Sequence, residues 1–223
     1  MDYRLRRLAQ MVEPGTRLAD IGTDHAYLPI WLVKRGLVDF AIASDIRQGP
    51  IQNAQSNVQA AGLTNRISVR LGPGLTTVKK EDAIETVVIA GMGGDLIRSI
   101  LVAAPLFPKL VLEPNIGEPG LRTWLTVHRY RINQEELLFD KGHSYELIQA
   151  FLTDQKQELS ERELLFGPEI LKHKGAAFRQ KWCGQLAYFK KLEQALRQAQ
   201  NPDQTRLTAL KDKQKLIEEE LND

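Results

Sequence analysis

Residues 18–29, LADIGTDHAYLP, have the pattern of a buried strand, a tight turn and the start of a helix. Leu18 and Ile21 suit a parallel strand covered on both faces, and Gly22 permits a sharp exit that a side chain would block. Apolar residues recur at helical spacing over residues 27–35. Open α/β sheets bind their ligands at such strand-to-helix turns, so we expect a ligand site here.

The acids of this turn indicate which ligand it binds. A dinucleotide fingerprint needs three glycines, whereas Gly22 stands alone between Asp20 and Asp24. Two carboxylates repel phosphates, which argues against a NAD-binding oxidoreductase, and they attract a cation. S-adenosylmethionine is a nucleoside cofactor that carries an α-ammonium and a sulfonium. Asp45 closes the next apolar run, where a carboxylate can accept hydrogen bonds from both ribose hydroxyls.

Composition limits the class of protein. The chain has 223 residues, enough for one domain with an appendage. A single cysteine, Cys183, excludes a disulfide framework, and the scattered histidines predict no metal site. The N-terminus has no long apolar run, so we expect neither a signal peptide nor a membrane anchor. The single cysteine favours the reducing cytoplasm. We also expect a monomer.

Strand and helix patterns alternate as far as residue 129, which predicts a mostly parallel, doubly wound sheet. Within this region, Gly72-Pro73-Gly74 follows an alternating strand, and Gly91-Met92-Gly93-Gly94 follows the β-branched run at 86–90. Glycines in such places allow the backbone to approach a ligand closely. Two extended runs, 130–140 and 143–153, are separated by a Lys-Gly turn and predict an antiparallel edge hairpin.

The C-terminal part has a different pattern. Apolar residues at helical spacing predict two amphipathic helices, broken at Asn201-Pro202-Asp203 and folded back as an antiparallel pair. We therefore predict a methyltransferase-type domain at 1–157 and a helical domain at 158–223. Acidic and basic residues balance over 1–159, so the net charge of +2 comes from the C-terminal part. No acid occurs between Glu169 and Glu193, and this segment is either an RNA-binding surface or a solvated helix face.

Four features together resemble one family. They are DIGTDHAYLP at 20–29, IAGMGG at 89–94, LEPN at 112–115 and the paired C-terminal helices. The chain resembles the bacterial tRNA (adenine(22)-N1)-methyltransferases, the TrmK family, over nearly its whole length. The resemblance implies a class I, Rossmann-like methyltransferase fold, a seven-stranded mostly parallel sheet with an antiparallel edge hairpin, and a C-terminal helical pair. It also implies S-adenosylmethionine as cofactor and the D-arm region of tRNA as substrate.

The resemblance assigns roles to residues of this chain. The cofactor would lie against one set: Asp20, Gly22, Thr23, Asp24, His25, Asp45, Ile46, Gly72, Gly74 and Gly91. The target adenine would be received by Gly91, Met92, Gly93 and Asn115. The charge pattern, rather than the resemblance, supplies the third set, which is predicted to contact RNA: Arg4, Arg7, Tyr27, Lys172, Lys174, Arg179, Lys181, Lys190 and Lys191. For Arg4 and Arg7, a solvated position on the first helix is the alternative. His25 and Tyr27 have alternative roles, His25 in shaping the turn and Tyr27 in packing at the helix start.

One departure from the family pattern concerns the cofactor's adenine. Family members often read GDGL where this chain has Gly72-Pro73-Gly74-Leu75, so a carboxylate that would accept a hydrogen bond from the adenine amine is missing. A catalytically silent RNA-binding scaffold, or a methyltransferase acting at another RNA position, is the alternative to the main hypothesis.

Overall fold

The computed structural model describes residues 1–198, 201 and 203–222. The elements follow one another in this order: α1 (Tyr3–Gln10), β1 (Thr16–Ile21), α2 (Tyr27–Lys34), β2 (Val38–Asp45), α3 (Gln48–Ala60), β3 (Ile67–Leu71), β4 (Thr86–Met92), α4 (Gly94–Val102), β5 (Lys109–Pro114), α5 (Glu118–Val127), β6 (Tyr130–Asp140), β7 (His143–Leu152), α6 (Glu161–Phe166), α7 (Ala176–Arg197) and α8 (Gln204–Asn222). Short 3₁₀ turns stand at Gly74–Thr77, Lys80–Asp82 and Leu171–His173.

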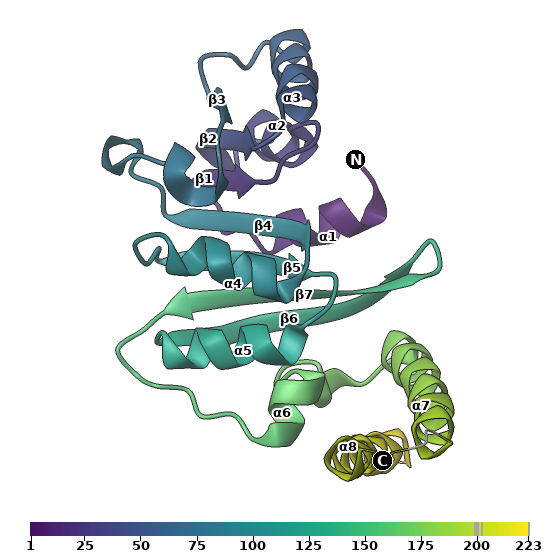
Figure 1. Cartoon of the computed structure of the whole chain (residues 1–223). Helices are drawn as coiled ribbons and strands as arrows, with labels where there is room; N and C mark the ends of the chain where they lie inside the picture. Colours follow the sequence, from purple (N-terminus) through teal and green to yellow (C-terminus); the bar gives the residue numbers. More distant parts are fainter. Residues whose placement is uncertain (199–200, 202, 223) are drawn as a thin grey trace.

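The seven strands form one sheet in the order β3-β2-β1-β4-β5-β7-β6 (Figure 1). Strands β1 to β5 pair in parallel, while β7 is antiparallel to both of its neighbours. The chain moves outward from β1 through β2 to β3, and then returns to place β4 on the other side of β1. The point between β1 and β4 is therefore the topological switch point, where open α/β sheets bind ligands beyond the carboxyl ends of the strands.

Alternation along the central strands builds one core on each face of the sheet. Leu18 of β1 faces a core shared with α1, α2 and α3, whereas Ala19 faces a second core shared with α4 and α5. Ala41 and Ile42 of β2 divide between the two cores in the same way. Because both faces are covered (Figure 1), these strands read as continuous apolar runs in the sequence.

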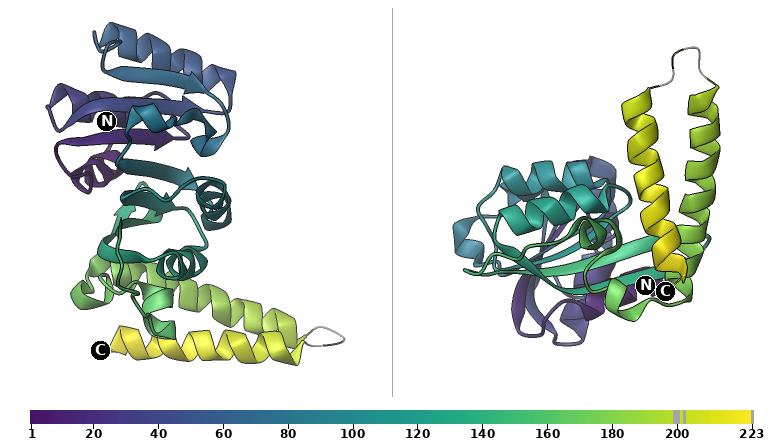
Figure 2. Two further views of the ribbon diagram at one scale, coloured as in Figure 1. Left: turned by 90° about the vertical axis from the view of Figure 1, so that its left-hand side faces the viewer. Right: turned by 90° about the horizontal axis from the view of Figure 1, so that it is seen from below.

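Helices α7 and α8 pack as an antiparallel pair that stands beside the sheet (Figure 2). Their junction with the sheet has its own apolar core, built on Phe166, Phe178, Trp182 and Ile217. Phe166 comes from α6, a helix that the sequence analysis did not include. The signal was available, since Ser160 and Glu163 form a capping box at its start.

A buried ion cluster joins the helical pair to the sheet. Arg122 of α5 binds Glu135 of β6 at 2.7 Å and also Glu146 of β7, and all three side chains are buried. Lys181 of α7 reaches Glu118 at 2.7 Å and Glu146 at 2.6 Å. Burial disfavours ionisation of Glu146, but the charges of Arg122 and Lys181 outweigh this effect and lower its pKa.

The predicted fold class, edge hairpin and helical pair are confirmed, with corrections at element ends. Strand β4 does not stop at Ala90 but continues to Met92, with a register shift at Gly91, whose φ is +74°. Helix α1 ends at Gln10, with Met11 as its C-cap. Of the predicted break at 201–203, Pro202 lies outside the described residues. The division at residue 157 stays a prediction.

Within the part of the chain described here, no helix is long and apolar enough to cross a membrane. The same residues contain no group of three or more side chains arranged to hold a metal ion.

Candidate functional site: a groove at the switch point

The groove forms around the turn after β1. Gly22 and Thr23 donate backbone N–H bonds to the carbonyl of Ser44, at 2.8 and 2.9 Å, which holds the turn against the end of β2. Gly22 has φ of +83°, and a Cβ at this position would lie 2.1 Å from Cε of Met92. The positive φ favours glycine here, and a side chain would also displace the methyl group of Met92 at the end of β4.

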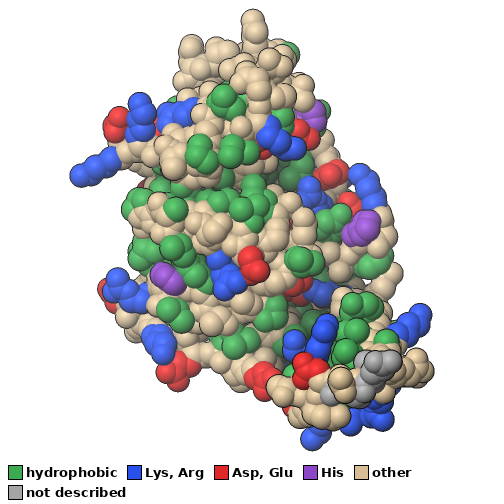
Figure 3. Space-filling model, viewed as in Figure 1, with side chains coloured by type: hydrophobic (Ala, Val, Ile, Leu, Met, Phe, Trp, Pro, Cys, Tyr) green, Lys and Arg blue, Asp and Glu red, His purple; other side chains and the backbone are tan. Residues whose placement is uncertain are grey.

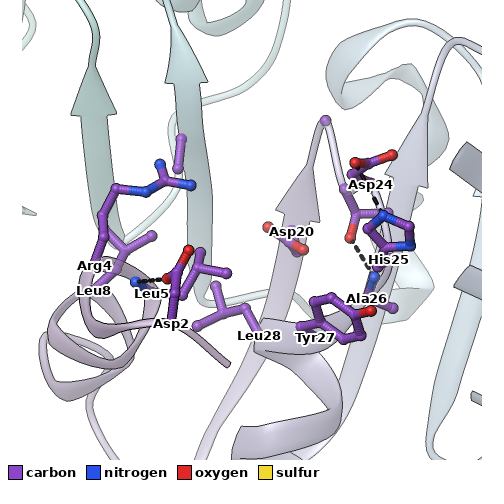
Figure 4. Close-up of a pocket in the computed structure, with 13 residues that line it drawn as sticks. Asp2, Arg4, Leu5, Leu8, Asp20, Asp24, His25, Ala26, Tyr27 and Leu28 are labelled. Carbon is purple, nitrogen blue, oxygen red and sulfur yellow. Dashed lines mark hydrogen bonds and ion pairs between the residues drawn. The ribbon is translucent and has the colours of Figure 1, made fainter. Parts of the chain in front are cut away.

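Two cavities flank Gly22 and together form one groove. The first, about 280 Å³, is lined by Asp20, Thr23, Asp24, His25 and Tyr27, with Arg4 and Leu8 of α1 as the opposite wall (Figure 4). The second, about 180 Å³, is lined by Asp45, Ile46, Gly72, Pro73, Gly74 and Met92. The cofactor-binding residues expected from the sequence are thus brought together, with the exception of Gly91, which lines neither cavity.

Asp20 is the buried charge of the groove. Its side chain lies between α1 and the β1 turn (Figure 4), and the residue is 8% exposed. The described residues give it no ion pair with a basic side chain. Burial raises its pKa to about 6, while a hydrogen bond with Thr23 acts in the opposite direction. A buried carboxylate without a cation is costly, and a cationic ligand would remove that cost.

Asp24 differs from Asp20 because it faces solvent. Its side chain is 64% exposed and pairs with Nε2 of His25 at 3.2 Å. The His25 ring in turn stacks on Tyr27, with ring centroids 5.0 Å apart. Tyr27 is half exposed, so this aromatic pair forms an accessible rim on the first cavity. The rim suits contact with a flat base as well as the turn-shaping role expected for His25.

Asp45 and the glycine turn after β3 shape the second cavity. Oδ1 of Asp45 accepts a hydrogen bond from the backbone N–H of Arg47 at 2.7 Å, which fixes the carboxylate beside the exposed Ile46. The far wall comes from Leu96 and Ile100 of α4. This end of the groove is mostly apolar, and Pro73 stands where a carboxylate was expected.

Glu113 is a site residue that the sequence analysis quoted, in LEPN, without giving it a role. It is fully buried at the end of β5, accepts the N–H of Gly91 at 3.1 Å and forms an ion pair with Arg4. Burial raises its pKa, although the charge of Arg4 opposes the shift. Its signal was the same as that of Asp20 and Asp45, an acid closing a buried parallel strand.

Asn115 does not line the groove. Its backbone N–H donates to the carbonyl of Met92 at 2.8 Å, so it lies next to the end of β4. Its side chain, however, borders a separate cavity between the sheet and α7. Of the four residues expected to receive the target base, only Met92 lines the groove, at its second cavity, and Gly93 begins α4 as its N-cap.

Most of the predicted RNA-binding side chains have acidic or carbonyl partners. The recorded pairs are Arg4–Glu113, Arg7–Glu136, Lys172–Glu169, Lys174–Glu220 and Lys190–Glu218, and Arg179 donates to the carbonyl of Leu221. On the face shown in Figure 3, basic side chains accordingly stand beside acidic ones around the C-terminal helices. Most of the acid-free run is thus paired, because Glu169 lies at its edge and the other acids come from α5, β7 and α8.

Lys181 is the clearest departure from the expected RNA-binding set. Its side chain is only 10% exposed and its ammonium is held by two carboxylates. Lys191, by contrast, is exposed, and the described residues give it no acidic partner.

Comparisons with known proteins decide the family. The model of the family "TrmK: tRNA (adenine(22)-N(1))-methyltransferase" matches residues 18–219. The chain belongs to the TrmK family. A curated tRNA (adenine(22)-N(1))-methyltransferase of Bacillus subtilis is 37% identical over 98% of this chain and 96% of that protein.

Solved structures of TrmK-type proteins share the fold. A putative tRNA (m1A22) methyltransferase of Streptococcus pneumoniae in complex with S-adenosyl-L-methionine has a TM-score of 0.90 and 36% identity, over 99% of both chains. The TrmK of M. capricolum in complex with S-adenosyl-homocysteine has a TM-score of 0.89 and 30% identity, over 100% of this chain and 98% of that one. The family expected from the motifs is therefore confirmed, and these two similar structures contain S-adenosylmethionine or its product, the cofactor class that the motifs predict.

Proposed function

We propose that this protein transfers a methyl group from S-adenosylmethionine to N1 of adenine 22 in tRNA. The observation that carries the proposal is Asp20, a buried carboxylate with no basic partner among the residues that the structure describes, next to Gly22, where a Cβ would collide with the side chain of Met92. Membership of the TrmK family supports tRNA as the substrate, and the groove is the candidate cofactor site. When bound, the cofactor supplies an activated methyl group on its sulfonium.

The residues of the groove fit that cofactor in three parts. Asp20 would accept hydrogen bonds from the α-ammonium at the first cavity, and Gly22, which has no side chain, would leave room for the cofactor beside the turn. Asp45 would hold the ribose hydroxyls through Oδ2, since the hydrogen bonds from Arg47 use Oδ1. Leu96 and Ile100, the apolar wall of the second cavity, would hold the adenine.

The target adenine requires positioning rather than a base catalyst. N1 of adenine carries a lone pair and no proton, so its attack on the methyl carbon needs no proton removal. In a tRNA this edge is paired or stacked, and the base must turn out of the helix. We assign its reception to the backbone of Gly91, Met92 and Gly93, to Asn115, and to the rim of His25 and Tyr27. Correct placement of the two reactants supplies most of the rate enhancement.

Glu113, which is fully buried, positions the residues that would receive the target base. It accepts the N–H of Gly91 and pairs with Arg4 of α1, and so connects the register shift of β4 at Gly91 to the wall of the first cavity.

We assign the RNA contacts to Arg7, to Lys191 and to exposed ion pairs of α7 such as Lys190–Glu218. We expect the protein to act as a monomer in the cytoplasm; light scattering of the purified protein tests the first expectation.

The deciding experiment is transfer of labelled methyl to unmodified tRNA, followed by digestion and identification of the modified nucleoside. We expect 1-methyladenosine, lost when adenine 22 is replaced by guanine. Cofactor binding without methyl transfer would instead identify a silent scaffold, and 1-methyladenosine surviving the replacement would identify another target position.

Asn115 is tested separately by Asn115→Ala. If its amide contacts the target base, the single-turnover rate should fall about 10-fold or more while cofactor affinity stays the same. An unchanged single-turnover rate would remove Asn115 from the receiving surface.

A further inference from the structure

A cavity of about 280 Å³ lies between the sheet domain and the helical pair, outside the groove. The sheet side contributes Asn115, Ile116 and Glu118, and the helical side contributes Trp182 and Gln185 of α7 and Lys213 of α8. These residues are distant in sequence, so the cavity exists only because the helical pair docks beside the sheet (Figure 2).

The cavity begins at the loop that receives the target base. Met92 accepts the N–H of Asn115 at 2.8 Å, and Ile116 accepts the N–H of Gly94 at 2.7 Å. The two loops are close enough that a Cβ on Gly94 would lie 2.7 Å from the carbonyl of Gly117. A strand of RNA with one nucleotide at Met92 therefore has its neighbouring nucleotide within reach of this cavity.

The walls of the cavity combine apolar surfaces with hydrogen-bonding groups. Ile116 is 72% exposed, although it is a large apolar residue next to the site. Among the described residues, the side-chain amide of Gln185 and the buried Nε1 of Trp182 have no hydrogen-bond partner. An amide that can donate and accept, beside apolar surface, suits the edge and faces of a nucleobase.

The charges of the cavity distinguish a base from a phosphate. Lys181 lines the cavity, but its ammonium is already held by Glu118 and Glu146. Glu118 itself lines the cavity and would repel a phosphate placed there. Lys213 of α8 is exposed, has no acidic partner in the described part of the chain and can meet the backbone of the bound strand.

We propose that this cavity binds the nucleobase of a nucleotide adjoining the target adenine, splayed out of its stack when the target base turns out. The inference rests on the proposed function, since it requires tRNA as the substrate. It gives the helical pair a role beside the reaction centre, because four of the eleven residues that line the cavity come from α7 and one from α8.

The test is a set of double-mutant cycles between the protein and the tRNA. One partner is Ile116→Ala or Gln185→Ala, and the other is a tRNA with a single abasic nucleotide at each position within three of the target. Dissociation constants are measured with the S-adenosyl-homocysteine-loaded protein. Each protein change should weaken binding of intact tRNA about fivefold. At one flanking position the abasic tRNA should be bound equally by the variant and the natural protein.

Matched control variants are Tyr188→Ala, an exposed aromatic on α7 outside the cavity, and Val127→Ala, an exposed apolar residue at the end of α5. Both should bind intact tRNA like the natural protein. Unchanged affinity for S-adenosyl-homocysteine verifies that each variant is folded.

Two outcomes overturn the inference: additive effects at every abasic position, or full affinity of both cavity variants for intact tRNA. Failure of the proposed function is distinguishable, because it appears as absence of 1-methyladenosine with the natural protein and intact tRNA. If methyl transfer occurs and the cycles are additive, only the base site is wrong.

Discussion

The groove and the domain junction both bury carboxylates, but the pKa values of Asp20 in the groove and of Glu146 at the junction shift in opposite directions. At the junction, Glu146 is enclosed by Arg122 and Lys181, and its pKa is lowered despite burial. In the groove, Asp20 is almost as buried, the described part of the chain gives it no basic partner, and its pKa is raised to about 6. The difference teaches that burial of a charge does not by itself mark a binding site. The presence or absence of an internal partner separates a structural charge from one that awaits a ligand.

The largest effect should come from removing Arg122, the basic partner of the buried carboxylates at the junction. Arg122→Met would leave Glu135 and Glu146 buried with only Lys181 nearby, and we expect the free energy of unfolding to fall by about 3–5 kcal/mol. Urea unfolding measures it. The control is Arg129→Met, an exposed arginine 3.9 Å from Asp154, which should change stability very little. A loss below about 1 kcal/mol for Arg122→Met would mean that the cluster does not hold the junction.

Removing the unpaired charge should affect binding instead of stability. Asp20→Asn keeps the shape of the side chain but loses the charge that meets the ammonium, so cofactor affinity should fall about 30- to 100-fold. The melting temperature of the unliganded protein should stay the same or rise, because a buried unpaired charge is removed. Calorimetric titration and thermal melting check both parts. Asp24→Asn, at a solvent-exposed position, should cost less than about 10-fold; a larger loss there than at Asp20 would reverse the assignment.

The pH dependence of binding offers a sharper test of Asp20. With a pKa of about 6 in the unliganded protein, cofactor affinity should be level above pH 7 and fall up to about 10-fold per unit below pH 6. The effect of Asp20 on the stability of the unliganded protein changes with pH in the opposite direction to cofactor affinity. Its folded pKa lies above the ordinary value of 3.8 for an aspartate, so Asp20 destabilises the folded protein less as pH falls from 6 toward 4. Affinity titrations from pH 5 to 8 should be flat for Asp20→Asn; an equal slope would assign the titration to another group.

The smallest expected effect adds a carboxylate to the groove. Pro73 is exposed and lines the second cavity, and Pro73→Asp restores the acid that family members often carry. A hydrogen bond to the adenine amine should tighten cofactor binding about fivefold, or about 1 kcal/mol. The matched control is Thr76→Asp, on the same turn but outside the second cavity. Equal affinities for Pro73→Asp and the natural protein would show that the adenine is held in another way.

Much of the fold was predictable because its signals are local. The buried strands appear as apolar runs, the edge hairpin as two extended runs around a Lys-Gly turn, and the helical pair as two periodic stretches. Element ends were less accurate, as at β4, because the bulge at Gly91 depends on pairing with β5 rather than on the residues themselves. The predictions for Asp20, Gly22 and Asp45 have the same local basis, since each stands at the end of a buried strand; the structure brings all three to the groove, and their roles stay predictions.

The sequence by itself therefore determined the family, the sheet and the acids of the groove, because these follow from periodicity and from motifs within one strand–turn–helix unit. Only the tertiary structure decided which charges are free. Lys181 reads as one of a run of lysines without acids, yet Glu118 and Glu146 come from α5 and β7 to neutralise it. Asp20 reads like Asp24, yet folding buries Asp20 and exposes Asp24. Pairing and burial depend on distances between elements far apart in the chain, and no local pattern encodes those distances.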